Sequence, residues 1–148
     1  MSDMKQRILT TLHRSEPFLC FLATLSEDGR PWVRTMRGAI DENLVIRCPT
    51  FAGTKKIAHI HVNPEVHVTC GDMEPSNPGS YFQIEARAEI KQDAADREAA
   101  WSDHLAKWFS DLEDPAYAVV RITPYRITAL PIGGGPAAEV WEAIDPPA

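Results

Sequence analysis

Apolar residues in this chain fall mostly into short runs and alternating stretches, the spacing that is typical of β-strands. Residues 81–91 alternate cleanly, with Phe82 and Ile84 on one face and Gln83 and Glu85 on the other. The apolar run at residues 18–25 predicts a strand that is covered on both faces. Further strands are expected at residues 31–40, 44–48, 65–71 and 117–130, the last bulged at Pro124, with a small extra strand at 139–141.

Three other segments have a helical spacing. Residues 3–14 place apolar side chains on one stripe, and residues 54–62 have a short apolar face that Gly53 or Thr54 can cap. Residues 93–112 have the clearest helix pattern, which we interpret as packing against the strands, with stacking on a cofactor as the alternative. The stripe consists of Trp101, Leu105, Trp108, Phe109 and Leu112. The acidic residues between 89 and 114 are interpreted as a solvated helix face.

Short turns connect the predicted strands. Asp28-Gly29 supplies the positive φ of a hairpin turn, residues 41–43 form another turn, and loops rich in proline and glycine are expected at 72–80 and 131–136. About six strands joined by hairpins, with peripheral helices, predict a mainly β fold, a small antiparallel barrel. A length of 148 residues suits one domain, residues 1–148, with one core.

Charge and cysteine content limit the possible partners and location. The net charge is −6 and no run of Lys or Arg exceeds two, so nucleic acid is not expected as a partner. The longest apolar run is too short to span a bilayer, and the N-terminus lacks the apolar core of a signal peptide. We therefore expect a cytoplasmic protein without a membrane contact. Cys20, Cys48 and Cys70 form no C-x-x-C pair and are expected to be reduced and buried.

Cations and hydroxyls converge between residues 34 and 56. Arg34 and Arg37 lie on a predicted strand, although on opposite faces, so only Arg34 is expected to reach a shared ligand. A loop from Pro49 to Lys56 then carries two threonines and two lysines into a helix start. Cations at the N-terminal end of a helix are unfavourable by roughly 0.3–1 kcal/mol each, and a bound phosphate makes their interaction favourable. The alternative is that both lysines are ordinary solvated surface residues.

The order of these residues resembles the pyridoxamine 5'-phosphate oxidase-like split barrels that bind flavin, most closely the general stress protein 26-like branch. The motif consists of Thr50, Thr54 and Lys56, followed by Asn63-Pro64 before the next strand. Later segments, residues 84–89 and 120–126, resemble the two following strands of the family. The resemblance implies a six-stranded antiparallel Greek-key split β-barrel and a homodimer with FMN sites at its interface.

The resemblance also implies a site. The FMN phosphate would contact Arg34, Thr50, Thr54, Lys55 and Lys56, and the isoalloxazine would lie along Arg34, Thr35, Met36 and Arg37 near Pro49. The partner chain would close the site with Tyr81 or groups near Trp101. The function expected is that of an FMN-dependent oxidoreductase, stress-related and with NAD(P)H as one candidate electron donor. Alternatives are a non-catalytic protein that sequesters flavin, and a split barrel that binds FAD, deazaflavin F420 or haem instead.

Departures from the oxidase pattern limit the expected chemistry. Ala39 stands where the oxidase has a cation, Leu130 stands where it has a tryptophan, and its C-terminal Arg/His motif has no counterpart. Pyridoxamine phosphate is therefore not expected as the substrate, and no catalytic residue is named. No metal site is expected either, because His59 and His61 diverge on a helix, although His67 could join one of them.

Overall fold

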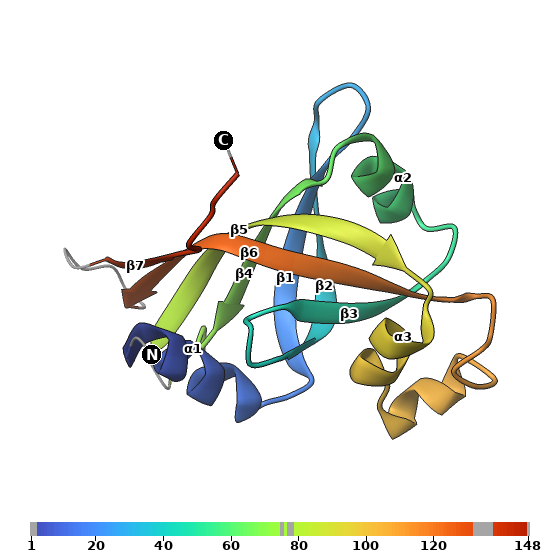
Figure 1. Ribbon diagram of the computed structural model, residues 1–148, viewed down its shortest axis with the longest axis horizontal. Helices are drawn as coiled ribbons and strands as arrows, with labels where there is room; N and C mark the ends of the chain where they lie inside the picture. The colour runs from blue at the N-terminus through green and yellow to red at the C-terminus, as the bar shows by residue number, and fades with distance from the viewer. Residues whose placement is uncertain (1–2, 75, 77–78, 132–137, 148) are drawn as a thin grey trace.

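The computed structural model describes residues 3–74, 76, 79–131 and 138–147, and within them strands dominate (Figure 1). Residues 75, 77–78 and 132–137 of the two predicted loops lie outside the described residues. The strands are β1 (Phe18–Leu25), β2 (Pro31–Ile40), β3 (Ile46–Phe51), β4 (Glu65–Gly71), β5 (Ser80–Lys91), β6 (Tyr117–Pro131) and β7 (Glu139–Glu142). The helices are α1 (Asp3–His13), α2 (Lys55–Val62), α3 (Ala94–Ala100) and the 3-10 helix η1 (Asp103–Lys107).

The strands form one antiparallel sheet in the order β3-β2-β1-β4-β5-β6-β7. Pairing of β3 with β6, from Ile46 opposite Ile122 to Phe51 opposite Tyr117, closes the first six strands into a barrel. After β3 the chain crosses through α2 to pair β4 with the other edge of β1, which is a Greek-key connection. The prediction of a six-stranded antiparallel Greek-key split barrel is confirmed. The extra strand is also confirmed, as β7 beside β6.

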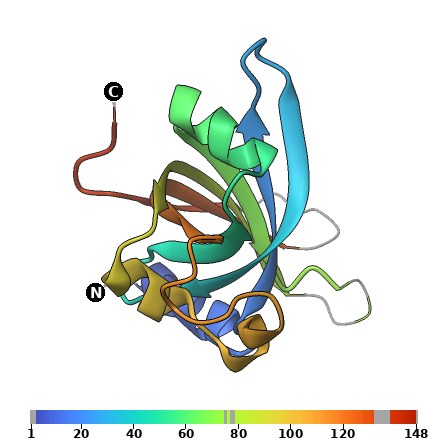
Figure 2. The same ribbon diagram turned by 90° about the vertical axis from the view of Figure 1, so that its right-hand side faces the viewer.

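Alternation along the strands fills the barrel. Leu22, Val68, Ile84, Ile122 and Ile127 point inward and are fully buried. In both views α1 lies toward the lower end of the barrel and α2 toward the upper end, where the hairpin of β1 and β2 rises above it (Figures 1 and 2). The apolar stripe of α1 is buried in the same core, as its spacing predicts. A register shift between Glu85 and Ala86, opposite Arg126 and Pro124, confirms the predicted bulge.

The third strand is longer than its pattern indicates. The predicted end at Cys48 is wrong, because β3 continues through Pro49 and Thr50 to Phe51, paired with β6 throughout. Its pairing with β2 is limited to Arg47 and Ile46, so the segment around Pro49 is paired on one side only. A proline is tolerated in such a segment because one of its two edges needs no hydrogen bond.

The predicted helix at residues 93–112 is also wrong. The chain leaves α3 at Ala100, is extended at Trp101, and forms η1 from Asp103 to Lys107. The break lets Leu105 and Phe109 pack with Tyr117 in a second, smaller core cluster. Packing in that cluster outweighs the helical periodicity, because short helices in proteins draw their stability mostly from tertiary contacts.

One face of β1 is exposed in the single chain. Inward residues of β1 are buried, but Leu19 is 47% exposed and Phe21 is 36% exposed. The prediction that this strand is covered on both faces is therefore wrong for the chain alone. In the described part of the chain, no helix is both long and apolar enough to cross a membrane.

Candidate functional site

Arg34 is held by one nitrogen of its guanidinium. This nitrogen, Nη1, donates to the hydroxyl of Thr24 (2.7 Å) and to the carbonyls of Leu22 (3.2 Å) and Trp32 (3.3 Å). The other two nitrogens, Nε and Nη2, make no hydrogen bond to any residue that the structure describes. Burial lowers the pKa of Arg34 from its ordinary value. One edge of this cation is thus fixed to β1 and β2, and its other edge still offers donors.

Lys56 lies next to Arg34, in the first turn of α2. Its Nζ donates to the hydroxyls of Thr50 (2.9 Å) and Thr54 (3.2 Å). Burial lowers the pKa of Lys56, and the positive charge of Arg34 lowers it further. Thr54 occupies the predicted cap position, but its hydroxyl donates to the carbonyl of Phe51 instead of capping the helix. The N–H groups at the helix start therefore have no side-chain cap.

These groups together could hold an anion. Arg34 and Lys56 are both part-buried, and neither forms an ion pair with a carboxylate within the described residues. Two like charges that are partly removed from water disfavour each other, and an anion between them relieves that cost. Thr50, the helix start and the free edge of Arg34 add hydrogen-bond donors.

Lys55 is not brought into this cluster. Its Nζ lies over the ring of Trp32, 4.6 Å from the ring centroid, and the edge of the same ring meets His59. These residues border a separate shallow hollow beside the turn between β1 and β2, together with Glu27 and Asp28. Successive residues of a helix point about 100° apart, so adjacent lysines rarely serve one small ligand.

A cleft of about 610 Å³ runs along β2, and neither Arg34 nor Lys56 lines it. Its lining includes Thr35, Met36 and Arg37 from β2 and Pro49 and Thr50 from β3. Thr50 connects the two features, because it lines the cleft and also accepts the hydrogen bond from Lys56. The residues predicted to hold a ring and those predicted to hold a phosphate are therefore contiguous, with Lys55 and Tyr81 as the exceptions.

The opposite wall of the cleft comes from α3 and η1 of the same chain. Trp101, His104, Trp108 and Phe109 line it, and Phe51 packs on Phe109 with ring centroids 4.8 Å apart. Sequence reasoning missed His104, because only the break between α3 and η1 brings it to the cleft. Trp108 is 60% exposed there, which an apolar position on an amphipathic helix would not predict. The aromatic stripe was the signal that could have found this wall.

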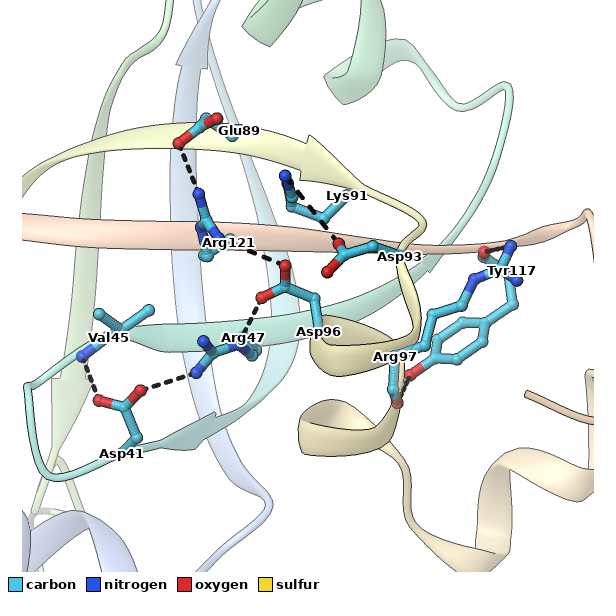
Figure 3. A network of polar contacts seen from close by, with 10 residues as sticks. All are labelled: Asp41, Val45, Arg47, Glu89, Lys91, Asp93, Asp96, Arg97, Tyr117 and Arg121. Carbon is cyan, nitrogen blue, oxygen red and sulfur yellow. Dashed lines mark hydrogen bonds and ion pairs between the residues drawn. The ribbon is translucent and has the colours of Figure 1, made fainter. Parts of the chain in front are cut away.

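A buried carboxylate fastens that wall to the barrel (Figure 3). Asp96 on α3 is 2% exposed and accepts hydrogen bonds from Arg47 Nε (2.7 Å) and Arg121 Nη1 (3.3 Å). The two arginines also pair with Asp41 and Glu89 respectively. Burial alone would lower the pKa of Arg47, but hydrogen bonds and charge from both carboxylates raise it. The prediction of a solvated acidic face is therefore wrong for Asp96.

Tyr81 lies away from the cluster. It sits on β5 between Gly71 and Leu130, is half-buried, and was expected to act from a partner chain. Its role stays a prediction. Trp101, in contrast, lines the cleft of its own chain. Among the described residues, no group of three or more His, Cys, Asp or Glu side chains could hold a metal ion.

Comparison with known proteins places this chain in a family. Residues 4–130 match the family model described as pyridoxamine 5'-phosphate oxidase. General stress protein 26 of Bacillus subtilis (strain 168) is 30% identical over 131 residues, which cover 88% of this chain and 91% of that protein.

Solved structures show the same fold. The crystal structure of General Stress Protein 26 from Bacillus anthracis has a TM-score of 0.76 and 26% identity, and the match covers 96% of this chain and all of that one. A heme binding protein from Mycobacterium smegmatis has a TM-score of 0.73 at 15% identity, over 96% of this chain and 59% of that one. The second likeness concerns the fold alone. By its family match and its relatives, the chain belongs to the pyridoxamine 5'-phosphate oxidase family.

Proposed function

We propose that this chain binds FMN, with the phosphate at the cation cluster and the ring in the adjoining cleft. The observation that carries the proposal is the pair Arg34 and Lys56, two part-buried cations without an acidic partner among the described residues. A phosphate is the ligand that fits them, because it accepts from a guanidinium, an ammonium, two hydroxyls and helix N–H groups at once. Thr50 and Thr54 supply the hydroxyls.

The cleft suits a flat, mostly apolar ring with a polar edge. A volume of about 610 Å³ lies within the usual range for small-molecule sites, and the wall from α3 and η1 is aromatic. The β2 segment from Thr35 to Arg37 would support one side of the ring. Arg37 lines the cleft and forms no ion pair with a described residue. Its positive charge would stabilise the reduced, electron-rich form of a bound flavin ring.

The proposed chemistry is that of an oxidoreductase whose substrate is unknown. A bound flavin would supply the two-electron redox chemistry. The chain's own residues bind the phosphate and orient the ring between β2 and the aromatic wall. NAD(P)H is the candidate electron donor. Because Trp108 is 60% exposed, the cleft is open to solvent at that wall, which leaves a second molecule access to the ring.

A flavin-sequestering protein is the alternative, and turnover distinguishes the two. An oxidoreductase loaded with FMN consumes NADPH or NADH continuously when an artificial acceptor is present. A sequestering protein holds FMN at the same affinity and shows no consumption above that of free FMN.

We also propose a homodimer. The outer face of β1 and β2 exposes Leu19, Phe21 and Val33, the last 65% exposed. Val33 is paired with Ala23, which follows Leu19 and Phe21 at every second residue of β1, so the three lie on one face of the sheet. A second copy would cover this face, which borders the cleft at Leu19. Burial of such side chains contributes roughly 25 cal/mol for each Å² of apolar surface removed from water.

The test is an FMN titration of matched charge variants. Lys56→Met keeps the side-chain stem and removes the charge, and it should weaken FMN binding by at least about ten-fold, as loss of a charge-assisted hydrogen bond does. Lys107→Met, on the exposed side of η1, is the control and should bind FMN as the unchanged protein does. Equal affinities for both variants would overturn the phosphate assignment.

A further inference from the structure

A buried hydrogen-bond chain leads away from Arg34 to a histidine. Arg34 Nη1 donates to Thr24 Oγ1 (2.7 Å), and Thr24 Oγ1 lies 2.8 Å from His59 Nδ1. Thr24 is 2% exposed and His59 is 7% exposed. The three residues come from β1, β2 and α2, so the two hydrogen bonds connect the barrel wall to the helix that carries Lys56.

The donors and acceptors available to Arg34, Thr24 and His59 indicate the direction of these two hydrogen bonds. A guanidinium has only donors, so the Thr24 oxygen must accept from Arg34. Thr24 makes no other side-chain hydrogen bond to a described residue, so its own proton has one available acceptor, His59 Nδ1. A hydrogen bond donated by Thr24 to Nδ1 requires the tautomer of His59 that carries its ring proton on Nε2. Its ring is also fixed by the edge contact with Trp32, at 5.7 Å between centroids.

The hydrogen bonds between Arg34, Thr24 and His59 oppose the repulsion between Arg34 and Lys56. Arg34 lowers the pKa of Lys56 through the repulsion between the two charges, and an unrestrained arginine would turn toward solvent, away from the lysine. Thr24 and the carbonyls of Leu22 and Trp32 hold the guanidinium through Nη1 alone. Nε and Nη2 have no hydrogen-bond partner among the described residues and remain available to a ligand.

We propose that Thr24 and His59 are positioning residues for the phosphate site. His59 Nδ1 accepts the hydrogen bond that Thr24 donates, which turns the Thr24 lone pairs toward Arg34 Nη1. Thr24 then holds the guanidinium so that Nε and Nη2 stay available to the phosphate. Neither residue touches the phosphate. The proposal rests on the proposed FMN function, and it assigns a ligand-directed role to two residues outside the predicted site.

Binding of FMN and riboflavin by two Thr24 variants tests the proposal. Riboflavin has the same ring without the phosphate, so a change in positioning acts on FMN alone. Thr24→Val keeps the shape and removes the hydroxyl, and FMN should bind about ten-fold more weakly with riboflavin unchanged. Thr24→Ser keeps the hydroxyl and should restore FMN binding to within about two-fold.

A second pair isolates His59. His59→Phe keeps an aromatic ring against Trp32 but has no acceptor, and should weaken FMN binding by several-fold. His59→Asn offers an oxygen near the place of Nδ1 and should recover part of that loss.

Three results would overturn the positioning role. They are an equal loss of FMN and riboflavin in Thr24→Val, no loss of either ligand, or equal FMN binding by Thr24→Val and Thr24→Ser. If the unchanged protein binds FMN no better than riboflavin, the phosphate site itself fails and the positioning role fails with it. The unchanged protein thus tests the proposed function, and the variants test the inference.

Discussion

Asp96 should contribute more to stability than any exposed acid of the chain, because it connects the wall of the cleft to the barrel. Its carboxylate is almost fully removed from water, and both of its oxygens accept from arginines of β3 and β6. Asp96→Asn keeps the shape and removes the negative charge. The amide then presents N–H donors to one of the two guanidinium groups, so a hydrogen bond becomes a contact between two donors.

The magnitude follows from what remains after the change. Removal of one partner from a buried ion pair costs about 3–5 kcal/mol. Arg47 keeps Asp41 at 2.8 Å and Arg121 keeps Glu89 at 2.9 Å, so neither cation is left alone and the lower end applies. We expect a loss of about 3 kcal/mol in the free energy of unfolding, which lowers Tm by about 6–12 °C for a chain of this size.

Chemical denaturation of matched variants measures this loss. Glu89→Gln removes an acid from the same network, but its side chain is 63% exposed, so the loss should be under about 1 kcal/mol. Tryptophan fluorescence supplies a second readout, because Trp101 and Trp108 lie on the wall that Asp96 holds. Equal losses for Asp96→Asn and Glu89→Gln would refute the claim that this carboxylate anchors the wall.

Two further predictions concern alkaline stability and assembly. Burial raises the pKa of the Tyr117 phenol to about 12, although Arg97 lowers it, so the fold favours the neutral form. Stability from Tyr117 is therefore present below pH 10 and is lost as pH rises toward 12, and in Tyr117→Phe the unfolding free energy should fall less steeply over that interval. Val33→Lys should convert a dimer to a monomer in sedimentation velocity, whereas Val140→Lys, at a similarly exposed position on β7, should not. A steeper alkaline fall in Tyr117→Phe, or a Val33→Lys chain that sediments as the unchanged protein does, would contradict these expectations.

The barrel could be predicted because the sequence features that specify its strands and turns lie close together along the chain. Alternation places inward and outward residues on each strand, and short turns such as Asp28-Gly29 join neighbouring strands. Errors arose where distant contacts override local pattern. Proline predicts a strand end at Pro49, but pairing with β6 carries the strand onward to Phe51. The stripe from Trp101 to Leu112 satisfies a helical period, but the chain breaks between α3 and η1. Leu105 and Phe109 are then buried with Tyr117, and Trp108 is left exposed.

The candidate site was predictable in part for the same reason. Thr50, Thr54 and Lys56 are close in sequence, so their convergence needs only a strand end and a helix start. Asp96 could not be recognised, because its partners Arg47 and Arg121 lie 49 and 25 residues away. The role of Thr24 could not be recognised for the same reason. In the sequence it is one small residue in an apolar strand, and its partners Arg34 and His59 come from β2 and α2.

The visible spectrum of the purified protein, recorded before and after dialysis, tests the central claim most directly. Our account predicts flavin absorption bands that survive dialysis, or that return when FMN is added, with the released cofactor identified as FMN by mass. The bands should be lost more readily in Lys56→Met than in Lys107→Met. A Soret band in place of flavin bands, or a protein that neither carries flavin nor binds added FMN, would contradict it.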